Sequence, residues 1–320
     1  MMIMIRESAV TTGDESGRMD IKQLQYLVAL AEERHFTRAA ERCHVTQPTL
    51  SGRIRQLEQE LGVPIVERGQ RYHDLTPEGR RVLQWAQAIL RDCAAMNEGL
   101  TVLKGGLAGR LSLGVVPSAL PMVVALTQSM RRRYPKVAFA IYSRTSDELL
   151  RDIQDFRLDA GITYLDNEPV EHMTTLDLYA ERYRLFVAQD HPWTNRRSVT
   201  WREAAEEPLC LLTPNMQNRR IIDEIFARTH KTPVAPVETD SIVNVWAHIK
   251  FAGLSGILPE YFSELLAPDT SIRSIALDDI DSTHRVGLVT LERDPLSPMV
   301  AALFETCREG ALFPLADNRG

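Results

Sequence analysis

Apolar residues recur at helical spacing in the stretch TRAAERCHVTQPTLSGRIRQLEQEL, residues 37–61. Four of them fall at intervals of four, three and four residues, which places them on one face of a helix: Leu50, Ile54, Leu57 and Leu61. Thr46 is the predicted N-cap of this helix, and Pro48 lies in its first turn, where a missing N–H costs little. A shorter helix precedes it, and the turn CHV joins the two, with Val45 as its buried anchor. The pattern predicts a helix-turn-helix.

The opposite face of the second helix is polar and cationic. It carries side chains that can reach base edges and phosphates in a major groove, namely Gln47, Thr49, Ser51, Arg53, Arg55 and Gln56. Residues 34–55 contain five arginines and one acid, Glu41, in a chain whose formal net charge is −6. A local positive patch on an acidic protein favours DNA binding. The alternative is an ordinary helical hairpin with a solvated polar face.

The segments on either side fit the same interpretation. Residues 20–33 show apolar residues at helical spacing, with Asp20 as a candidate N-cap, and Phe36 is expected to close the same core. Gly62 is the predicted C-cap of the second motif helix. The stretch VPIVERGQRYHDLTPEG after it predicts a small hairpin, a wing with Arg68 and Arg71 at its tip near phosphate. A plain surface hairpin is the alternative.

A long helix is predicted next, from Pro77 to Lys104, with Thr76 as its cap. Its apolar residues fall at heptad spacing: Val82, Ala86, Ile89, Cys93, Met96, Leu100 and Leu103. About 28 residues make a helix roughly 42 Å long. A narrow apolar stripe on such a helix favours pairing with the same helix of a second chain. Packing of the helix on its own domain is the alternative.

From Arg110 onward, buried strands alternate with helices. LSLGVV, KVAFAIYS and LDAGITYL are predicted strands, and Ser118 is expected to begin a helix that runs to Tyr134. A second set of strands begins near Arg182. This alternation predicts an α/β fold with largely parallel sheets in two lobes. Lobe I is expected at residues 107–181 plus 284–320, and lobe II at 182–283.

Ligands of such sheets bind at the carboxyl ends of strands, beside helix N-termini, which favour anions. The residues predicted at these points are almost all small hydroxyl or amide residues: Ser118, Thr145, Ser146, Thr163, Tyr164, Thr213, Asn215 and Ser241. Together they suit a small organic acid. Taken singly, each can equally be a helix cap or a strand-end residue.

Composition narrows the class of protein. The 320 residues are 44% hydrophobic and 25% charged, which is typical of about two or three globular domains. No apolar run approaches the roughly 18 residues of a membrane span. The four cysteines are widely spread with no CxxC and no zinc-like spacing, so we expect a cytoplasmic, reduced chain without metal or cofactor. Residues 1–18 are interpreted as a disordered tail or a start codon assigned too early, with Met19 as the start.

Two other classes of function remain open. An enzyme on the α/β lobes lacks support, because the chain has no P-loop, no GxGxxG after a strand, no GxSxG and no HExxH. A redox sensor would use Cys43, Cys93, Cys210 or Cys307, none of which has a resolving cysteine nearby in sequence.

The run MDIKQLQYLVALAEERHFTRAAERCHVTQPTLSGRIRQLEQELGVPIVERGQRYHDLTPEG resembles the N-terminal domain of LysR-type transcriptional regulators. Weaker resemblance continues to about Pro314 in DAGITYL, ETDSIVNVWAHIKFAGLSGILPE and RDPLSP. It implies a winged helix-turn-helix over 19–76, a dimerising coiled-coil linker helix over 77–106, and a two-lobed effector domain like type 2 periplasmic binding proteins. It further implies a homotetramer that bends promoter DNA, and RNA polymerase is a further candidate partner.

The resemblance also implies roles for individual residues. Those expected to contact DNA are Arg38, Gln47, Pro48, Thr49, Ser51, Arg53, Arg55 and Arg68. Those at positions that often line an effector cleft are Ser118, Thr145, Thr163 and Ser241. Gly52 departs from the pattern, because family members often have arginine or another long side chain there. A glycine inside a helix costs about 1 kcal/mol relative to alanine, and here it also removes one DNA contact.

Overall fold

The computed structural model describes residues 19–67, 74–166, 168–265 and 270–309. The predictions for residues 1–18, for Arg68 and Arg71, and for the side chain of Leu103 lie outside the described residues. The chain divides into two compact units, 1–94 and 95–320, so the division falls inside the long helix. The domain boundaries taken from the sequence stay predictions.

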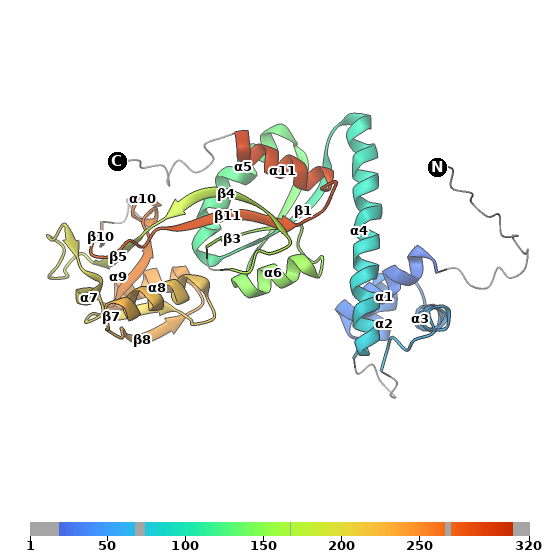
Figure 1. Ribbon diagram of the computed structural model, residues 1–320, viewed down its shortest axis with the longest axis horizontal. Helices are drawn as coiled ribbons and strands as arrows, with labels where there is room; N and C mark the ends of the chain where they lie inside the picture. Colours follow the sequence, from blue (N-terminus) through green and yellow to red (C-terminus); the bar gives the residue numbers. More distant parts are fainter. Residues whose placement is uncertain (1–18, 68–73, 167, 266–269, 310–320) are drawn as a thin grey trace, which may run out of the picture. The chain divides into compact units, whose positions relative to one another are not determined.

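Unit 1 begins with three helices (Figure 1): α1 (Ile21–Glu33), α2 (Phe36–Arg42) and α3 (Gln47–Leu61). The predicted caps are confirmed. The Asp20 side chain accepts a hydrogen bond from the backbone N–H of Gln23 at 2.8 Å. Thr46 caps α3 by accepting one from the N–H of Thr49, and Gly62 ends α3 with a φ of 67°.

The core of unit 1 forms where α1 and α3 face each other. Its fully buried leucines and isoleucine belong to both helices: Leu24, Leu27, Leu30, Leu50, Ile54 and Leu57. Two details of the prediction are wrong. Leu61 is 40% exposed, because it is the last residue of α3. Val45 is only half-buried, because it lines a surface cavity beside the turn.

The base of the predicted wing is an antiparallel pairing of Val66 with Leu75. Glu58 of α3 holds this pairing in place. Its carboxylate is buried and accepts hydrogen bonds from the backbone N–H groups of Ile65 at 2.8 Å and of Val66 at 3.1 Å. On the other side, Gly79 lies so close that a Cβ added to it would be 2.1 Å from the carbonyl oxygen of Ile65. The hairpin base is therefore fixed between α3 and the helix that follows.

That helix, α4 (Pro77–Gly105), begins with Thr76 accepting a hydrogen bond from the Gly79 N–H at 2.8 Å. The prediction that its heptad residues form one continuous seam is wrong. Ala86 is fully buried in the core of unit 1, and Val82 and Ile89 pack against that core. Only the later residues are open, with Met96 61% and Leu100 50% exposed, while Cys93 is half-buried. The alternative reading, packing on the helix's own domain, therefore holds for the first half of the stripe.

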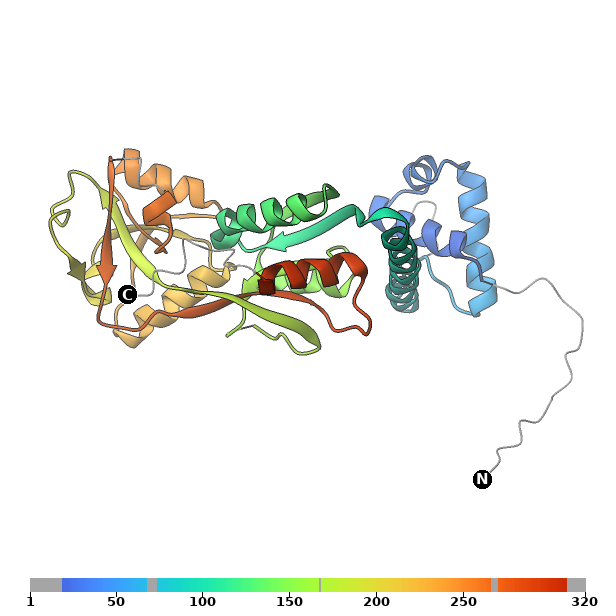
Figure 2. The same ribbon diagram turned by 90° about the horizontal axis from the view of Figure 1, so that it is seen from above.

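Unit 2 contains two sheets, and the first, with its helices, is lobe I. The strand order is β2-β1-β3-β11-β4. The strands are β1 (Ala108–Val115), β2 (Lys136–Ser143), β3 (Ala160–Tyr164), β4 (Met173–Glu181) and β11 (His284–Leu291). Helices α5 (Val123–Arg133) and α11 (Pro298–Glu309) cover one face of this sheet and α6 (Ser146–Gln154) the other (Figures 1 and 2).

The second sheet, with its helices, is lobe II, and its strand order is β6-β10-β5-β9-β7-β8. Its strands are β5 (Tyr183–Ala188), β6 (Ser198–Val199), β7 (Pro208–Leu212), β8 (Val234–Thr239), β9 (Ser255–Pro259) and β10 (Ile272–Leu277). Its helices are α7 (Trp201–Ala204), α8 (Gln217–Arg228), α9 (Ile242–Ala252) and α10 (Phe262–Leu265). The chain passes between the lobes twice, after β4 and after β10, and one apolar cluster contains residues of both sheets.

Two expectations about the lobes are corrected. The sheets are mixed rather than largely parallel, because β11 runs antiparallel to β3 and β4, and β5 runs antiparallel to β9 and β10. Ser118 does not begin an α-helix. It lies in a 3-10 helix (Pro117–Met122), and α5 starts only after Pro121, whose ring nitrogen cannot donate an α-helical hydrogen bond.

Among the described residues, no helix combines the length and the apolar character needed to cross a membrane.

Candidate DNA-binding and effector sites

The polar face of α3 is open to solvent. Gln47, Pro48, Thr49 and Arg55 are exposed and Ser51 is half-exposed, while Leu50, Ile54 and Leu57 of the opposite face are buried. Gly52 lies among these residues, and a Cβ added to it would have no heavy atom within 4 Å. The helix therefore presents hydrogen-bonding groups and one cation on a surface that its own domain leaves uncovered.

The other two predicted arginines are held by contacts within unit 1. One guanidinium nitrogen of Arg53 lies 3.2 Å from the carboxylate of Asp20 and 3.3 Å from the side-chain oxygen of Gln56. Arg38 donates to the backbone carbonyl of Glu33 at 2.6 Å, although its side chain is 62% exposed. An exposed pair of this kind contributes little stability, so both arginines remain available to phosphate and stay predicted DNA contacts.

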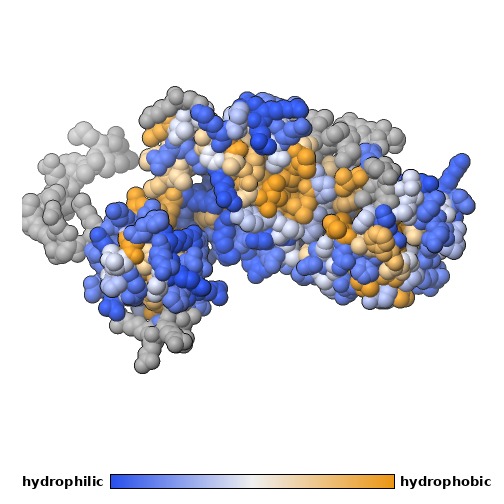
Figure 3. All heavy atoms as spheres, turned by 180° about the vertical axis from the view of Figure 1, so that it is seen from behind, coloured by the Kyte–Doolittle hydropathy of each residue, from blue (hydrophilic) through white to orange (hydrophobic). Residues whose placement is uncertain are grey.

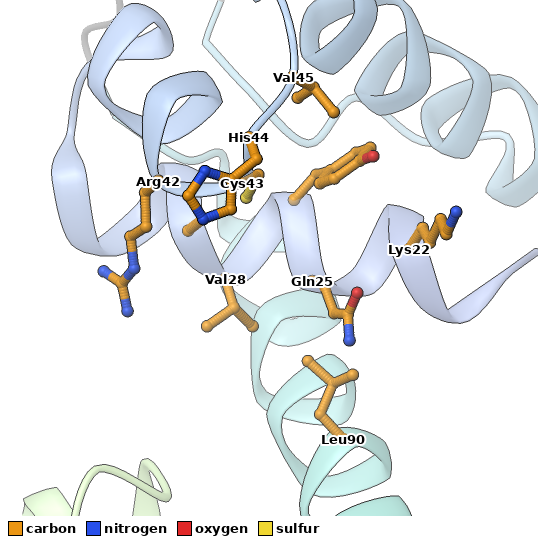
Figure 4. A pocket seen from close by; sticks show the side chains of 10 residues that line it. Lys22, Gln25, Val28, Arg42, Cys43, His44, Val45 and Leu90 are labelled. Carbon is orange, nitrogen blue, oxygen red and sulfur yellow. The ribbon is translucent and has the colours of Figure 1, made fainter.

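A cavity of about 550 Å³ lies beside the turn of the motif (Figure 4). Residues of α1, the α2–α3 turn and α4 line it, including Lys22, Val28, Cys43, His44 and Leu90. Burial raises the pKa of the Cys43 thiol, and the charge of Arg42 opposes this only in part.

Two of the predicted effector residues are brought together at the start of α6. The hydroxyl of Ser146 lies 3.0 Å from that of Thr163 at the end of β3, and both residues are fully buried. Thr145 has a structural role beside them. Its hydroxyl accepts from the N–H of Glu148, and the Glu148 carboxylate accepts from the N–H of Thr145, which is a capping box.

Ser118 and Tyr164 belong to a different, interior group. The Ser118 hydroxyl lies 2.9 Å from the Tyr164 hydroxyl, which donates to the Glu181 carboxylate at 2.5 Å and lies 3.0 Å from that of Tyr183. All four residues are at most 2% exposed. Burial raises the pKa of Glu181 to about 7, although the hydrogen bond from Tyr164 opposes the rise. Glu181 and Tyr183 flank the first passage between the lobes, and neither was predicted from the sequence.

A charged group joins the two lobes beside Ser146. Arg220 of α8 in lobe II has one guanidinium nitrogen 3.0 Å from the carboxylate of Glu168 in lobe I and another 3.5 Å from that of Asp147. Its Nε donates to the Gln217 side-chain oxygen at 2.5 Å. Glu168 and Arg220 were not predicted from the sequence, because an ion pair between residues 52 positions apart leaves no spacing signal.

The remaining predicted residues lie in lobe II. Thr213 and Ser241 are half-buried and Asn215 is exposed. Ser241 occupies the N-cap position of α9 without a side-chain cap, and its N–H donates to the hydroxyl of Thr239 at 3.3 Å. Within the described ranges no hydrogen bond links these three residues to Ser146 or Thr163. In the same ranges no cluster of three or more His, Cys, Asp or Glu side chains could hold a metal ion.

A helix-turn-helix with the base of a wing, followed by a long helix and two α/β lobes, defines a class of transcriptional regulators. Residues 21–80 match the family profile described as bacterial regulatory helix-turn-helix protein, lysR family. Residues 104–312 match the one described as LysR substrate binding domain. The chain therefore belongs to the LysR family of transcriptional regulators.

Individual relatives agree with this assignment. The hydrogen peroxide-inducible genes activator of Pectobacterium carotovorum is 37% identical over 195 residues, 61% of this chain and 64% of the relative, so the match covers less than two thirds of that protein. The HTH-type transcriptional regulator YnfL of Escherichia coli is 31% identical over 293 residues, 88% of this chain and 95% of the relative.

Solved structures share the fold. A full-length OxyR variant from Pseudomonas aeruginosa superposes with a TM-score of 0.72 at 27% identity, covering 92% of this chain and 96% of that one. The LysR family regulator CbnR in complex with its target DNA has a TM-score of 0.65 at 20% identity, covering 91% of this chain and 99% of that one, and shows likeness of fold alone.

Proposed function

We propose that this chain is a cytoplasmic, sequence-specific DNA-binding regulator of transcription whose promoter binding responds to a small anionic effector held between the two lobes. The observation that carries the proposal is the open polar face of α3, with Gln47, Thr49 and Arg55, on a winged helix-turn-helix of the LysR family. The hydroxyl pair of Ser146 and Thr163 at the start of α6 supports the effector part. We propose no enzymatic activity for the chain.

In this mechanism, two recognition helices of a dimer read an inverted repeat across about one helical turn of DNA. Two dimers form a tetramer that bends the promoter and presents it to RNA polymerase. The effector changes how far the two lobes close on each other. This change alters the arrangement of the dimers and therefore the bend angle of the DNA. The effector can do so only through a difference in its affinity for the two states, and a coupling of about 1–3 kcal/mol is typical.

Peroxide sensing is the second candidate function, because several relatives are named as peroxide-inducible activators. The reactive form of cysteine is the thiolate. Burial works against that form here, since it raises the pKa of Cys210 to about 11 and that of Cys307 to about 12, and it also raises that of Cys43. Thiol chemistry at these three positions therefore gives less support than effector binding does.

The DNA-binding part is tested at Gln47. We expect Gln47→Ala to relax base choice, with about 1–3 kcal/mol of discrimination lost at one position of each half-site, because a side-chain amide can make paired hydrogen bonds to a base. Gln59→Ala is the matched control, since Gln59 is exposed on the last turn of the same helix. Footprinting on the DNA upstream of the chain's own gene, at two salt concentrations, measures both. Equal effects of the two variants would contradict the recognition-helix assignment.

The self-association part is tested at Leu100, which is 50% exposed on the half of α4 that unit 1 does not cover. We expect Leu100→Asp to halve the mass seen in sedimentation, because it places a charge in an apolar helix pairing. Asn97→Asp is the control, as Asn97 is exposed one turn earlier. An unchanged mass would mean that α4 does not hold the dimer.

Further apolar surface supports assembly beyond a dimer. Val124 is 68%, Val243 72% and Phe251 75% exposed, all in unit 2. Figure 3 shows apolar side chains gathered in patches on the visible face. Patches of this kind on a regulator with a proposed tetrameric state are candidates for contacts between copies.

A further inference from the structure

A partly buried ion pair crosses between the lobes beside the predicted effector residues. The Glu168 side chain follows β3 in lobe I and is 2% exposed, and its carboxylate lies 3.0 Å from the guanidinium of Arg220 in lobe II. Arg219, the preceding residue, pairs instead with Asp223 and Glu238 of its own lobe. Arg220 is thus a cation that α8 directs to the other lobe, and Glu168 is the anion that receives it.

The surroundings of the Glu168 carboxylate are those of a bound small acid. The hydroxyl of Ser146, at the first position of α6, lies 3.0 Å from that of Thr163, and Ser146 lowers the pKa of the Glu168 carboxyl group. Gln217 orients the Arg220 guanidinium by accepting from its Nε. A hydroxyl, a guanidinium and the positive end of a helix dipole are the donors that bind carboxylates most strongly.

Holding Glu168 in this position is opposed by two effects. Burial raises the pKa of its carboxyl group, and the nearby charge of Asp147 raises it further, while Ser146 and Arg220 lower it. The Asp147 carboxylate lies 3.5 Å from the same guanidinium and competes for it. An outside carboxylate that took the place of Glu168 would keep the favourable donors and return the Glu168 charge to water.

We propose that Ser146 and Arg220 form a carboxylate-binding site that Glu168 fills from within the chain, so that an acid effector binds by displacing Glu168. This inference rests on the proposed function, because it names the effector class as a small carboxylate and Glu168 as its competitor. It adds two residues, Glu168 and Arg220, to the site that the hydroxyl residues define. Since Arg220 belongs to the other lobe, displacement of Glu168 also breaks an ion pair between the lobes.

Chemical rescue of the full chain tests the proposal. Glu168→Ala removes the internal carboxylate and leaves room for acetate beside Arg220. We expect the variant to melt below the wild type in chloride, and acetate at equal ionic strength to raise its melting midpoint by about 3–6 °C once it is about tenfold above its dissociation constant. The wild type should show a smaller acetate-specific shift, because Glu168 competes with acetate for the site, and Glu171→Ala, whose residue is exposed three positions later, should match the wild type.

The double variant Glu168→Ala/Arg220→Gln tests whether acetate binds beside Arg220. We expect acetate to leave the melting midpoint of this variant unchanged. Rescue that persists without Arg220, an equal acetate shift in the wild type, or no rescue at all would each overturn the proposal. If Glu168→Ala does not fold, Glu168→Gln takes its place, since its neutral amide keeps the side-chain volume and should still allow an acetate shift larger than that of the wild type. The assay contains no DNA, so its failure is separate from a failure of Gln47→Ala in footprinting.

Discussion

Gly79→Ala is expected to lower the free energy of unfolding of unit 1 by about 3 kcal/mol, the upper end for overpacking. The added methyl group would lie 2.1 Å from the carbonyl oxygen and 2.8 Å from the carbonyl carbon of Ile65. These are backbone atoms, so no side-chain rotation relieves the overlap. Ile65 cannot move away either, because Glu58 holds its N–H and Thr76 donates to its carbonyl.

Gly52→Ala is the matched control for this prediction. Gly52 also lies within a helix, but the added methyl group would have no atom within 4 Å. We therefore expect Gly52→Ala to stabilise unit 1 by up to about 1 kcal/mol through helix propensity alone. Urea unfolding followed by circular dichroism measures both variants. Similar changes in the two would show that the contact between α4 and the hairpin base is looser than described.

The second large effect is a dependence of stability on pH that comes from Glu181. Its pKa is raised from 4.5 in the unfolded chain to about 7 in the fold, so the folded state binds the proton more tightly. Its contribution to stability is complete below pH 4.5 and is lost as the pH rises through 7. A difference of this size corresponds to about 3 kcal/mol.

Glu181→Gln isolates this contribution, because an amide can still accept from Tyr164 but cannot ionise. We expect the variant to match the wild type near pH 4.5 and to exceed it by about 3 kcal/mol above pH 7 in urea unfolding. His284 acts in the opposite direction, since burial lowers its pKa, but it is present in both proteins and its effect cancels. Parallel pH profiles would show that Glu181 ionises normally in the fold.

The parts of the fold that local patterns determine could be predicted from the sequence. The leucine spacing, Thr46 and Gly62 set the ends of α3, and KVAFAIYS became β2 with the predicted bounds. The strands β4 and β10 were missed, because both are only partly buried and neither shows a clean alternation. The heptad stripe of α4 was ambiguous in a physical sense. Heptad spacing is expected both for a helix that packs on its own domain and for one that pairs with a second chain. In α4, Ala86 packs on its own domain, whereas Leu100 is exposed and available to a partner helix.

The site was predictable only as far as chain neighbours define it. Ser146 and Thr163 followed from the rule that ligands bind at strand ends beside helix N-termini. Glu168, Glu181 and Arg220 did not, since a single acid or arginine in a sequence is most often a solvated residue. Their pairing arises from contacts between residues that are well separated in the chain, within lobe I for Glu181 and Tyr164 and between the lobes for Glu168 and Arg220.

The position of β11 in the first sheet governs the order in which the lobes can be completed during synthesis. Within the described residues, β4 pairs only with β11, yet the ribosome makes the whole of β5 to β10 between them. Lobe II therefore has all its strands while β4 still has no partner strand. The sheet that is begun first is closed last, and until His284–Leu291 emerges the nascent chain exposes a strand that other chains can pair with.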